Sequence, residues 1–418
     1  MALAAPLVYK CRERNPNGYI KGLSTNQWAH KYVMYMGRRE GVVVNDGLSH
    51  GLFGKIDHNH GGNFGDINNI SATADYVKKK VEAGTYLYDN VISIAKADFM
   101  RLGYDGQNAW RQLAEDNVHK MAEKVGILPS KLEYVAALHI DKGKPNFHIL
   151  FWSKDQGIKP RFNYKKTFGG IRSNLVKYVY EDDLRHLSRI KTLARDAMVG
   201  ETDDYFKDFF QPIHTMKPGE YRKMVEDIDS DPALVRGKLL DRNIPNAVLD
   251  DFAMKIIQLK EKLPRKGRLS YGFLPPDLKK ETADIIRELL NTNPDFKREF
   301  DEYKNIHRDI ASYYSTNPDA LKRAEQKAEE DIIQRMSNKL LQSVKDFNRE
   351  WDNNTYQRAA QRNASINLMS SLFRILTRSN NSAAQKSKRL PSSSTERIEA
   401  RRDMRKQLEH SSSWGQGQ

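Results

Sequence analysis

The sequence has little cysteine and no long apolar runs, and each shortage excludes a class of protein. Its single cysteine, Cys11, excludes internal disulfides and zinc sites built from several thiolates. No stretch reaches the roughly 18–20 apolar residues that a membrane-spanning helix needs. The apolar run near the start of the sequence is too short for a secretory signal peptide. We therefore expect a soluble, cytoplasmic protein.

The chain is long and basic. Its 418 residues are enough for two domains, each with a core of its own. Lys and Arg number 69 against 54 Asp and Glu, and the net charge of +15 favours a polyanionic partner such as nucleic acid. Because acidic residues are also numerous, a cationic protein without such a partner is the alternative.

Strand-like and helix-like segments alternate in the first half of the chain, which predicts an α/β (α+β) fold: a sandwich with one sheet covered by helices. The predicted segments are a strand at Leu7–Arg12, a helix at Gln27–Arg39, loops at Val42–Gly54 and Lys55–Ile70, a strand at Tyr86–Ile94, a helix at Ala109–Lys124, a hairpin at Leu132–Ser153 and a helix at Phe168–Arg195.

From about Asp203 the pattern predicts helices only, separated by proline-containing breaks, with one long charged helix at Pro318–Phe347. Ser379–Gln418 is rich in Ser, Asn, Gln and charge, and predicts a disordered tail with a short helix at Thr395–Glu409. We therefore divide the chain into a domain of residues 1–200, a mainly α-helical domain of residues 201–376 and a tail of residues 377–418.

The hairpin is the stretch most suggestive of a functional site. Lys142-Gly143 separates its two apolar runs as a two-residue turn, so His139 is predicted to lie opposite Asn146. Side chains alternate along a strand, which places His139, Asp141, Asn146 and His148 on one face and leaves the other apolar.

Two imidazoles, an amide and a carboxylate on one sheet face predict a divalent-cation site, because each would be costly to bury without a partner. Three ligands (His139, Asn146 and His148) leave positions open for phosphate oxygens. Mg²⁺ or Mn²⁺ fits this set best, with Zn²⁺ as an alternative. We expect Asp141 to hold a histidine in one tautomer. Two histidines satisfied within the core are the simpler alternative.

A literal His-Asn-His occurs at positions 58–60, within Lys55–Ile70, which is rich in Gly, Asn and His. These three letters alone are a weak signal for a metal-dependent nuclease, since such a site needs a ββα context and a further histidine. We interpret them as part of a mobile loop.

A phosphate-polarising metal needs a nucleophile. Tyr32 and Tyr35 lie three residues apart on the predicted helix at Gln27–Arg39, and Arg38 and Arg39 follow them. From spacing alone, two core aromatics and a solvated basic helix end are the alternative.

Several separate blocks resemble the MobL-type relaxases of the MOBP class, which are endonucleases of the HUH superfamily. The blocks are KYVMYMGRREGV (Lys31–Val42), VISIAKADFMRLGYDGQNAWRQL (Val91–Leu113), LEYVAALHIDKGKPNFHILFWS (Leu132–Ser153), GGIRSNLVKYVYEDDLRHLSRIKTLARD (Gly169–Asp196) and LPRKGRLSYGFLPPDLKKETADII (Leu263–Ile286). Together they touch most of residues 1–315, and the tail is not covered.

The resemblance implies an HUH-type antiparallel sheet that carries the histidine motif, with the nucleophilic tyrosine on a nearby helix. It implies nicking of one DNA strand at an origin of transfer by tyrosine transesterification, for mobilization of a plasmid or integrative element. The motif maps onto His139, Asn146 and His148, with Asp141 at the acidic position. Tyr35, followed by Met36 and Gly37, matches the motif tyrosine better than Tyr32.

The sequence departs from the family pattern at two positions. The family usually has histidine where this chain has Asn146, and often where it has Lys144. An amide ligand is expected to weaken the binding of softer metals, so a degenerate enzyme that binds DNA without nicking it is one alternative.

The implied partners are single-stranded DNA at the origin of transfer, with Arg38, Arg39, Lys142 and Lys144 near its phosphates, and a type IV coupling protein with accessory relaxosome proteins. A rolling-circle replication initiator shares the chemistry and would differ in its target origin. A purely structural helical protein is a further alternative, which absence of salt-dependent DNA binding would favour.

Overall fold

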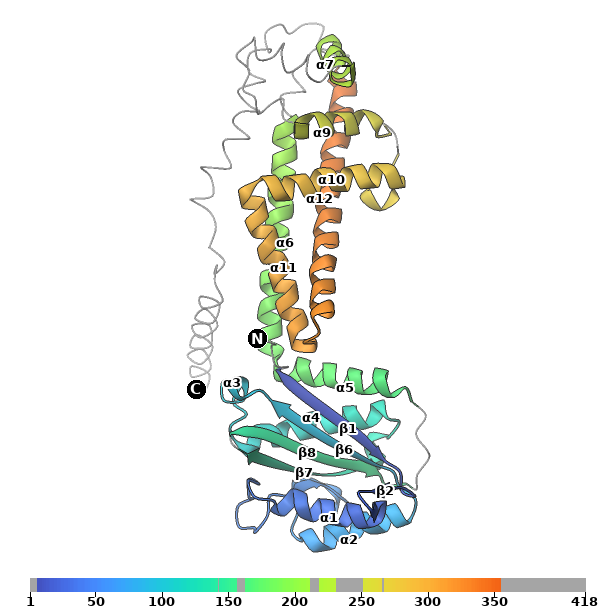
Figure 1. The fold of residues 1–418 in the computed structure, drawn as a ribbon, viewed down its shortest axis with the longest axis vertical. Helices are drawn as coiled ribbons and strands as arrows, with labels where there is room; N and C mark the ends of the chain where they lie inside the picture. Colours follow the sequence, from blue (N-terminus) through green and yellow to red (C-terminus); the bar gives the residue numbers. More distant parts are fainter. Residues whose placement is uncertain are drawn as a thin grey trace, which may run out of the picture. The chain divides into compact units, whose positions relative to one another are not determined.

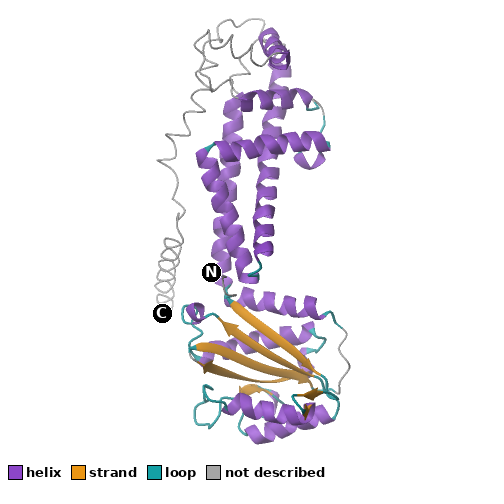
Figure 2. Cartoon of the chain, in the orientation of Figure 1, coloured by secondary structure: helices purple, strands orange, loops and turns teal. Residues whose placement is uncertain are grey.

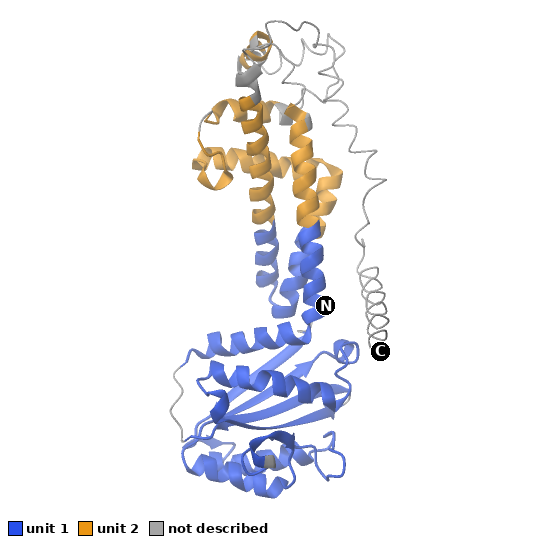
Figure 3. Cartoon of the chain, turned by 180° about the vertical axis from the view of Figure 1, so that it is seen from behind, with its two compact units in different colours: residues 1–193, 303–328 blue, residues 194–302, 329–418 orange. Residues whose placement is uncertain are grey.

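The computed structural model describes residues 6–141, 143–155, 162–210, 218–230, 251–264 and 267–354. The chain divides into two compact units, one of residues 1–193 and 303–328 and the other of residues 194–302 and 329–418 (Figure 3). Because the units are interleaved in the sequence and the chain after residue 354 lies outside the described part, the limits predicted at residues 200 and 376 and the disordered tail stay predictions.

The first unit is built on a six-stranded antiparallel sheet with the strand order β1-β6-β8-β7-β4-β5 (Figures 1 and 2). The predicted α+β class is therefore confirmed. The strands are β1 (Leu7–Arg14), β4 (Phe53–Lys55), β5 (Phe64–Asp66), β6 (Leu87–Ile94), β7 (Leu132–Asp141) and β8 (Lys144–Ser153). A small separate hairpin joins β2 (Tyr19–Ile20) to β3 (Leu23–Ser24).

Helices cover both faces of this sheet (Figure 1). On one face, α1 (Thr25–Arg38) and α2 (Ile70–Glu82) pack on Val135, Ala137, Leu150 and Trp152. On the other face, α4 (Gln107–Lys124) places Trp110 against Phe147, at a ring distance of 5.2 Å. The short α3 (Lys96–Phe99) and the helix α5 (Tyr164–Val179) complete the N-terminal part of this unit. The histidine face of the hairpin is therefore partly covered by helix, which the alternation along the strands did not predict.

The hairpin pairs in the predicted register, with His139 opposite Asn146 and Asp141 opposite Lys144. Gly143 has φ of +70°, a conformation that suits a glycine in a two-residue turn. The register prediction is therefore confirmed, and it decides which side chains share a face.

The prediction of a mobile loop at Lys55–Ile70 is wrong. This segment contributes β5 and the last residue of β4 to the sheet, with a 3₁₀ turn at His60–Gly62 between the two strands. The first two residues of β4 lie in Val42–Gly54, which was also predicted as loop, and the helix α2 that follows was not predicted. The segment is rich in Gly and Asn, which are poor strand formers, but pairing of β4 with β7 overrides that preference.

The described residues of the second unit form helices, one 3₁₀ turn at Tyr271–Phe273 and connecting segments but no strand, and this confirms the predicted change of pattern. Its core is aromatic and aliphatic, and includes the pair Phe210 and Phe347 with ring centroids 5.4 Å apart. The helices that lie in it wholly or in part are α6 (Glu181–Phe210), α7 (Pro218–Ser230), α9 (Asp251–Lys262), α10 (Pro276–Thr292), α11 (Pro294–Tyr314) and α12 (Pro318–Asn354). No described helix of either unit combines the length and the hydropathy that crossing a lipid bilayer requires.

Candidate active site

The hairpin brings the two predicted histidines together. The ring centroids of His139 on β7 and His148 on β8 lie 4.6 Å apart. His139 is fully buried and His148 is 8 % exposed. Asn146 lies directly across from His139 and is partly buried. The three predicted metal ligands therefore lie next to one another on two paired strands.

Tyr35 reaches the same place from helix α1. Its ring stands edge-on to both imidazoles, with centroid distances of 5.9 Å to His139 and 6.2 Å to His148. It is 41 % exposed, and its hydroxyl oxygen accepts a hydrogen bond of 2.7 Å from Arg39. An accessible phenol beside two imidazoles, with a cation on its oxygen, is placed to act as a nucleophile.

The backbone after α1 fastens that helix to the hairpin. The amide of Val43 donates to Leu138, and the amide of Ile140 donates to Gly41, each at 2.8 Å. Gly41 has φ of +82°, and a Cβ there would lie 3.0 Å from the carbonyl oxygen of Ile140. This segment was predicted as part of a loop, yet its strand-like pairing sets the separation between Tyr35 and the histidines.

His139 has one ring nitrogen engaged and one without a partner. Nε2 lies 2.7 Å from the carbonyl oxygen of Met36, which can only accept, so Nε2 carries the hydrogen. Nδ1 is buried and has no hydrogen-bond partner. We expected Asp141 to fix this tautomer, but the Met36 carbonyl does so instead. Asp141 is half exposed and pairs with Arg39 at 3.7 Å.

Burial keeps both histidines neutral. It lowers the pKa of His139, with a smaller contribution from the charge of Arg39. It also lowers the pKa of His148 to about 3, with further contributions from His139 and Arg39. A neutral imidazole is the form that binds a metal ion.

The residues present fit a divalent cation. The unpaired Nδ1 of His139 is a buried lone pair that such an ion would satisfy, and His148 and Asn146 supply further donors beside it. Among the described residues no group of three or more His, Cys, Asp and Glu side chains could hold a metal ion, so the amide of Asn146 is essential to a three-ligand set.

Tyr32 is placed differently from Tyr35. Its hydroxyl lies 2.6 Å from Asp89 and 3.1 Å from Nδ1 of His148, and its ring stacks on Trp28. Burial and the neighbouring Asp89 raise its pKa far above the usual value for tyrosine. These contacts favour Tyr35 as the nucleophile, because a phenol that is hard to ionise attacks poorly.

The sequence analysis missed Asp89 and Arg14. Asp89 is 7 % exposed and pairs with Arg14 at 2.5 Å. The sequence carried one signal for Asp89: it stands in Tyr-Asp-Asn in the middle of the predicted strand Tyr86–Ile94. A carboxylate buried there needs a partner.

The four predicted DNA-contacting residues are not all described. Arg38 is exposed at the end of α1, Lys144 is exposed at the hairpin turn and Arg39 contacts Tyr35. Lys142 lies outside the described residues. Their contact with DNA stays a prediction.

The first histidine of the His-Asn-His stretch has contacts within the fold. The ring of His58 packs on Tyr76 at 4.4 Å, and its Nε2 lies 3.3 Å from the hydroxyl of Thr73. The side chain of His60 lies outside the described residues.

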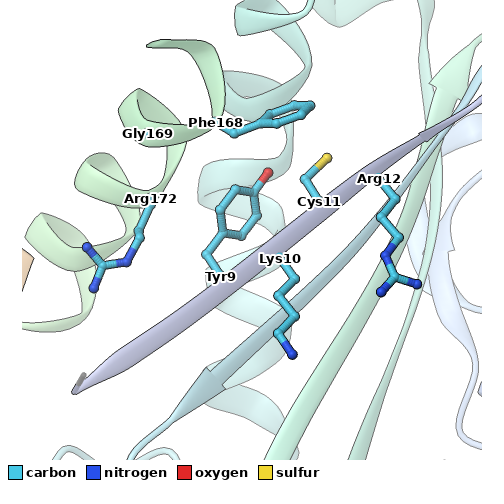
Figure 4. A pocket seen from close by; sticks show the side chains of 7 residues that line it. All are labelled: Tyr9, Lys10, Cys11, Arg12, Phe168, Gly169 and Arg172. Atoms are coloured by element: carbon cyan, nitrogen blue, oxygen red, sulfur yellow. The ribbon is translucent and has the colours of Figure 1, made fainter. Parts of the chain in front are cut away.

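A separate hollow of about 450 Å³ lies beside the edge strand β1 and helix α5 (Figure 4). Two of its polar side chains are used within the unit: the Tyr9 hydroxyl donates to Asn90, and Arg172 donates to the Leu7 carbonyl. Burial raises the pKa of the Cys11 thiol to about 12, so this thiol is inert. We assign no chemistry to the hollow.

Residues 21–215 match the model of a protein family described as MobL relaxases. The matched region is somewhat less than half of the chain. It includes Tyr35 and the whole hairpin, and it supports a MobL-type relaxase, a family of DNA-nicking proteins of mobilization. No match was found among curated proteins or among solved structures. Assignment to the MOBP class and the HUH superfamily stays a prediction.

Proposed function

We propose that this relaxase nicks one strand of DNA at an origin of transfer, with Tyr35 as the nucleophile. The observation that carries the proposal is the position of Tyr35: its ring lies about 6 Å from both imidazoles while Arg39 donates to its hydroxyl oxygen. The family match supports a transfer origin over the replication origin of a rolling-circle initiator.

In the proposed reaction the Tyr35 oxygen attacks the scissile phosphorus. The O–P bond to Tyr35 forms, the bond to the 3′ oxygen breaks, and the products are a 5′-phosphotyrosyl link and a 3′ hydroxyl. The phenolic proton passes to solvent and the leaving 3′ oxygen takes up a proton. The guanidinium of Arg39 stabilises the phenolate, and the reverse reaction rejoins the strand.

His139, Asn146 and His148 would hold Mg²⁺ or Mn²⁺. When bound, the cation neutralises charge on the phosphate oxygens. The protein's own part is to present neutral imidazoles, as burial does for both histidines. We further propose that single-stranded DNA crosses the sheet face beside α1, with Arg38, Arg39, Lys142 and Lys144 near its phosphates. The helical unit would then serve to grip DNA or to bind the coupling protein and accessory relaxosome proteins.

The test uses single-stranded oligonucleotides that carry the element's transfer origin, labelled at either the 5′ or the 3′ end, with Mn²⁺ and denaturing gels. We expect the 3′ label to become attached to wild type and to Tyr32→Phe but not to Tyr35→Phe, and the 5′ label to be released. An adduct that persists in Tyr35→Phe and disappears in Tyr32→Phe would assign the nucleophile to Tyr32. Binding without any adduct in wild type would instead support a DNA-binding protein that has lost nicking.

A further inference from the structure

The hydroxyl of Tyr32 lies between a carboxylate and an imidazole. It is 2.6 Å from Oδ1 of Asp89 and 3.1 Å from Nδ1 of His148. A carboxylate can only accept, so the single hydrogen of the hydroxyl goes to Asp89. The hydroxyl oxygen must then accept from Nδ1–H of His148, which leaves the lone pair of His148 on Nε2.

Asp89 is held in place from its other side. Its Oδ2 accepts a hydrogen bond of 2.5 Å from Arg14, whose guanidinium lies 4.5 Å from the ring centre of Trp28. Trp28 in turn stacks on Tyr32 with centroids 4.6 Å apart. Arg14 on β1, Asp89 on β6 and Tyr32 on α1 thus form a chain of contacts that ends at His148, which we call the Tyr32 relay.

The other histidine is oriented in the opposite sense. His139 donates from Nε2 to the carbonyl of Met36 and keeps its lone pair on Nδ1. Tyr32 and Met36 lie one helical turn apart on α1, on either side of Tyr35 in the sequence. One helix therefore supplies the proposed nucleophile and the anchor of each imidazole.

We propose that Tyr32 is a positioning residue that, through Asp89, holds His148 in the Nδ1–H tautomer so that Nε2 faces the metal site. The meaning of this arrangement for metal binding rests on the proposed function. The tautomer itself does not, so the two ideas can fail separately.

A substitution of Asp89 tests the Tyr32 relay because it should reverse the direction of each hydrogen bond between residue 89 and His148. In Asp89→Asn the amide oxygen stays toward the donor Arg14, which turns the amide NH₂ toward Tyr32. The Tyr32 oxygen then accepts from the amide and its hydrogen goes to Nδ1 of His148, which forces the hydrogen of the imidazole onto Nε2. Tyr32→Phe should leave the imidazole in a mixture of tautomers, since the ring still packs on Trp28.

The experiment is long-range ¹H–¹⁵N correlation spectroscopy of the histidine rings in the full chain without metal, with His148 assigned by comparison with His148→Gln. We expect Nδ1–H in wild type, Nε2–H in Asp89→Asn and a mixture in Tyr32→Phe. Mn²⁺ affinity, measured by the free-ion electron paramagnetic resonance signal, should fall about 10–100-fold in Asp89→Asn, as for other residues that orient a metal ligand.

Tyr76→Phe is the matched control. The Tyr76 hydroxyl also bonds a buried carboxylate, Glu133, at 2.9 Å, but it has no contact with His148. This variant should keep the wild-type tautomer and Mn²⁺ affinity, and Tyr35→Phe should keep both while losing the covalent adduct.

Nε2–H in wild type overturns the proposal, and this needs no variant to fold. The proposal is also overturned if both Asp89→Asn and Tyr32→Phe keep the wild-type tautomer of His148 and the wild-type Mn²⁺ affinity. If wild type shows Nδ1–H but forms no adduct with DNA, the relay stands and the proposed function fails.

Discussion

The ring of Tyr35 meets the ring of His139 edge-on, at 81° and with 5.9 Å between the centroids, although the two residues come from a helix and a strand far apart in the sequence. Arg39 completes this arrangement, because its guanidinium lies 5.4 Å from the centre of the Tyr35 ring and donates to its hydroxyl. The predictions below depend on this arrangement and on the elements that hold it.

Arg39→Gln should slow formation of the covalent adduct about 100-fold, because the donor of the hydrogen bond to the developing phenolate is then no longer charged. Single-turnover rates at saturating oligonucleotide measure this without interference from DNA affinity. Arg38→Gln, one residue earlier on the helix, should change affinity and leave that rate unaltered. Equal rate losses in both variants would contradict the assignment of Arg39.

Asn146→Ala should lower Mn²⁺ affinity by at least about tenfold, since it removes one of three proposed ligands. Asn146→His should raise the affinity for Zn²⁺, because imidazole suits that ion better than an amide does. Isothermal titration calorimetry on both variants checks this. If Asn146→Ala binds Mn²⁺ as wild type does, the amide is not a ligand.

Gly41→Ala should destabilise the protein and slow the adduct. A Cβ at positive φ costs about 1–2 kcal/mol, and here it would also press on the Ile140 carbonyl and move α1 from the hairpin. Gly47→Ala is the control, since Gly47 has a similar φ of +72° but open space around it. Urea unfolding should show a lower stability of both variants. The rate of adduct formation should fall only in Gly41→Ala.

Lys10 and Arg12 should contribute to binding of single-stranded DNA. They are exposed on β1 and lie opposite Val91 and Asp89 of β6, hence on the sheet face that carries His148. Figure 4 shows them on the other side of β1 from Tyr9 and Cys11.

Alanine at Lys10 and Arg12 should weaken DNA binding and lower the dependence of log K on log salt by about 0.7 for each phosphate that the variant no longer neutralises. The exposed pair Lys165 and Lys166 on α5 is the control for charge alone. An equal loss of affinity in the control double variant would mean that binding reflects net charge and not this face.

Glu299 should make the stability of the helical unit depend on pH. Burial, followed by repulsion from Glu201, raises the pKa of Glu299 from 4.5 to about 7. Between these values the unfolded chain has already lost the proton that the folded chain keeps. Stability should therefore fall as pH rises from about 4.5 to 7 and stay low above pH 7. The loss should be about 2 kcal/mol, less than the full pKa change would give, because the side chain is only partly buried and solvent screens its charge.

Glu299→Gln removes this charge, so it should flatten the pH dependence and be more stable than wild type above pH 7. Urea unfolding of both proteins across that range, with Glu330→Gln as the exposed control, measures the difference. If the stability of Glu299→Gln still falls with rising pH as that of wild type does, another group causes the pH dependence.

The sequence by itself determined the hairpin, its register and the neighbouring positions of His139, Asn146 and His148. Strand alternation and a two-residue turn are local rules, so they can be read without knowledge of the fold. The same holds for helix α1 and for the change to helices after the sheet.

Only the tertiary structure decided which groups complete the site. Asp89 comes from a different strand, the Met36 carbonyl is a backbone atom with no sequence signature, and pairing of the segment after α1 with β7 depends on the packed position of the helix. Tyr32 and Tyr35 lie only three residues apart on α1. The hydroxyl of Tyr32 is nevertheless hydrogen-bonded to a buried carboxylate, whereas Tyr35 is exposed to solvent. Burial and long-range contacts, which spacing cannot reveal, distinguish them.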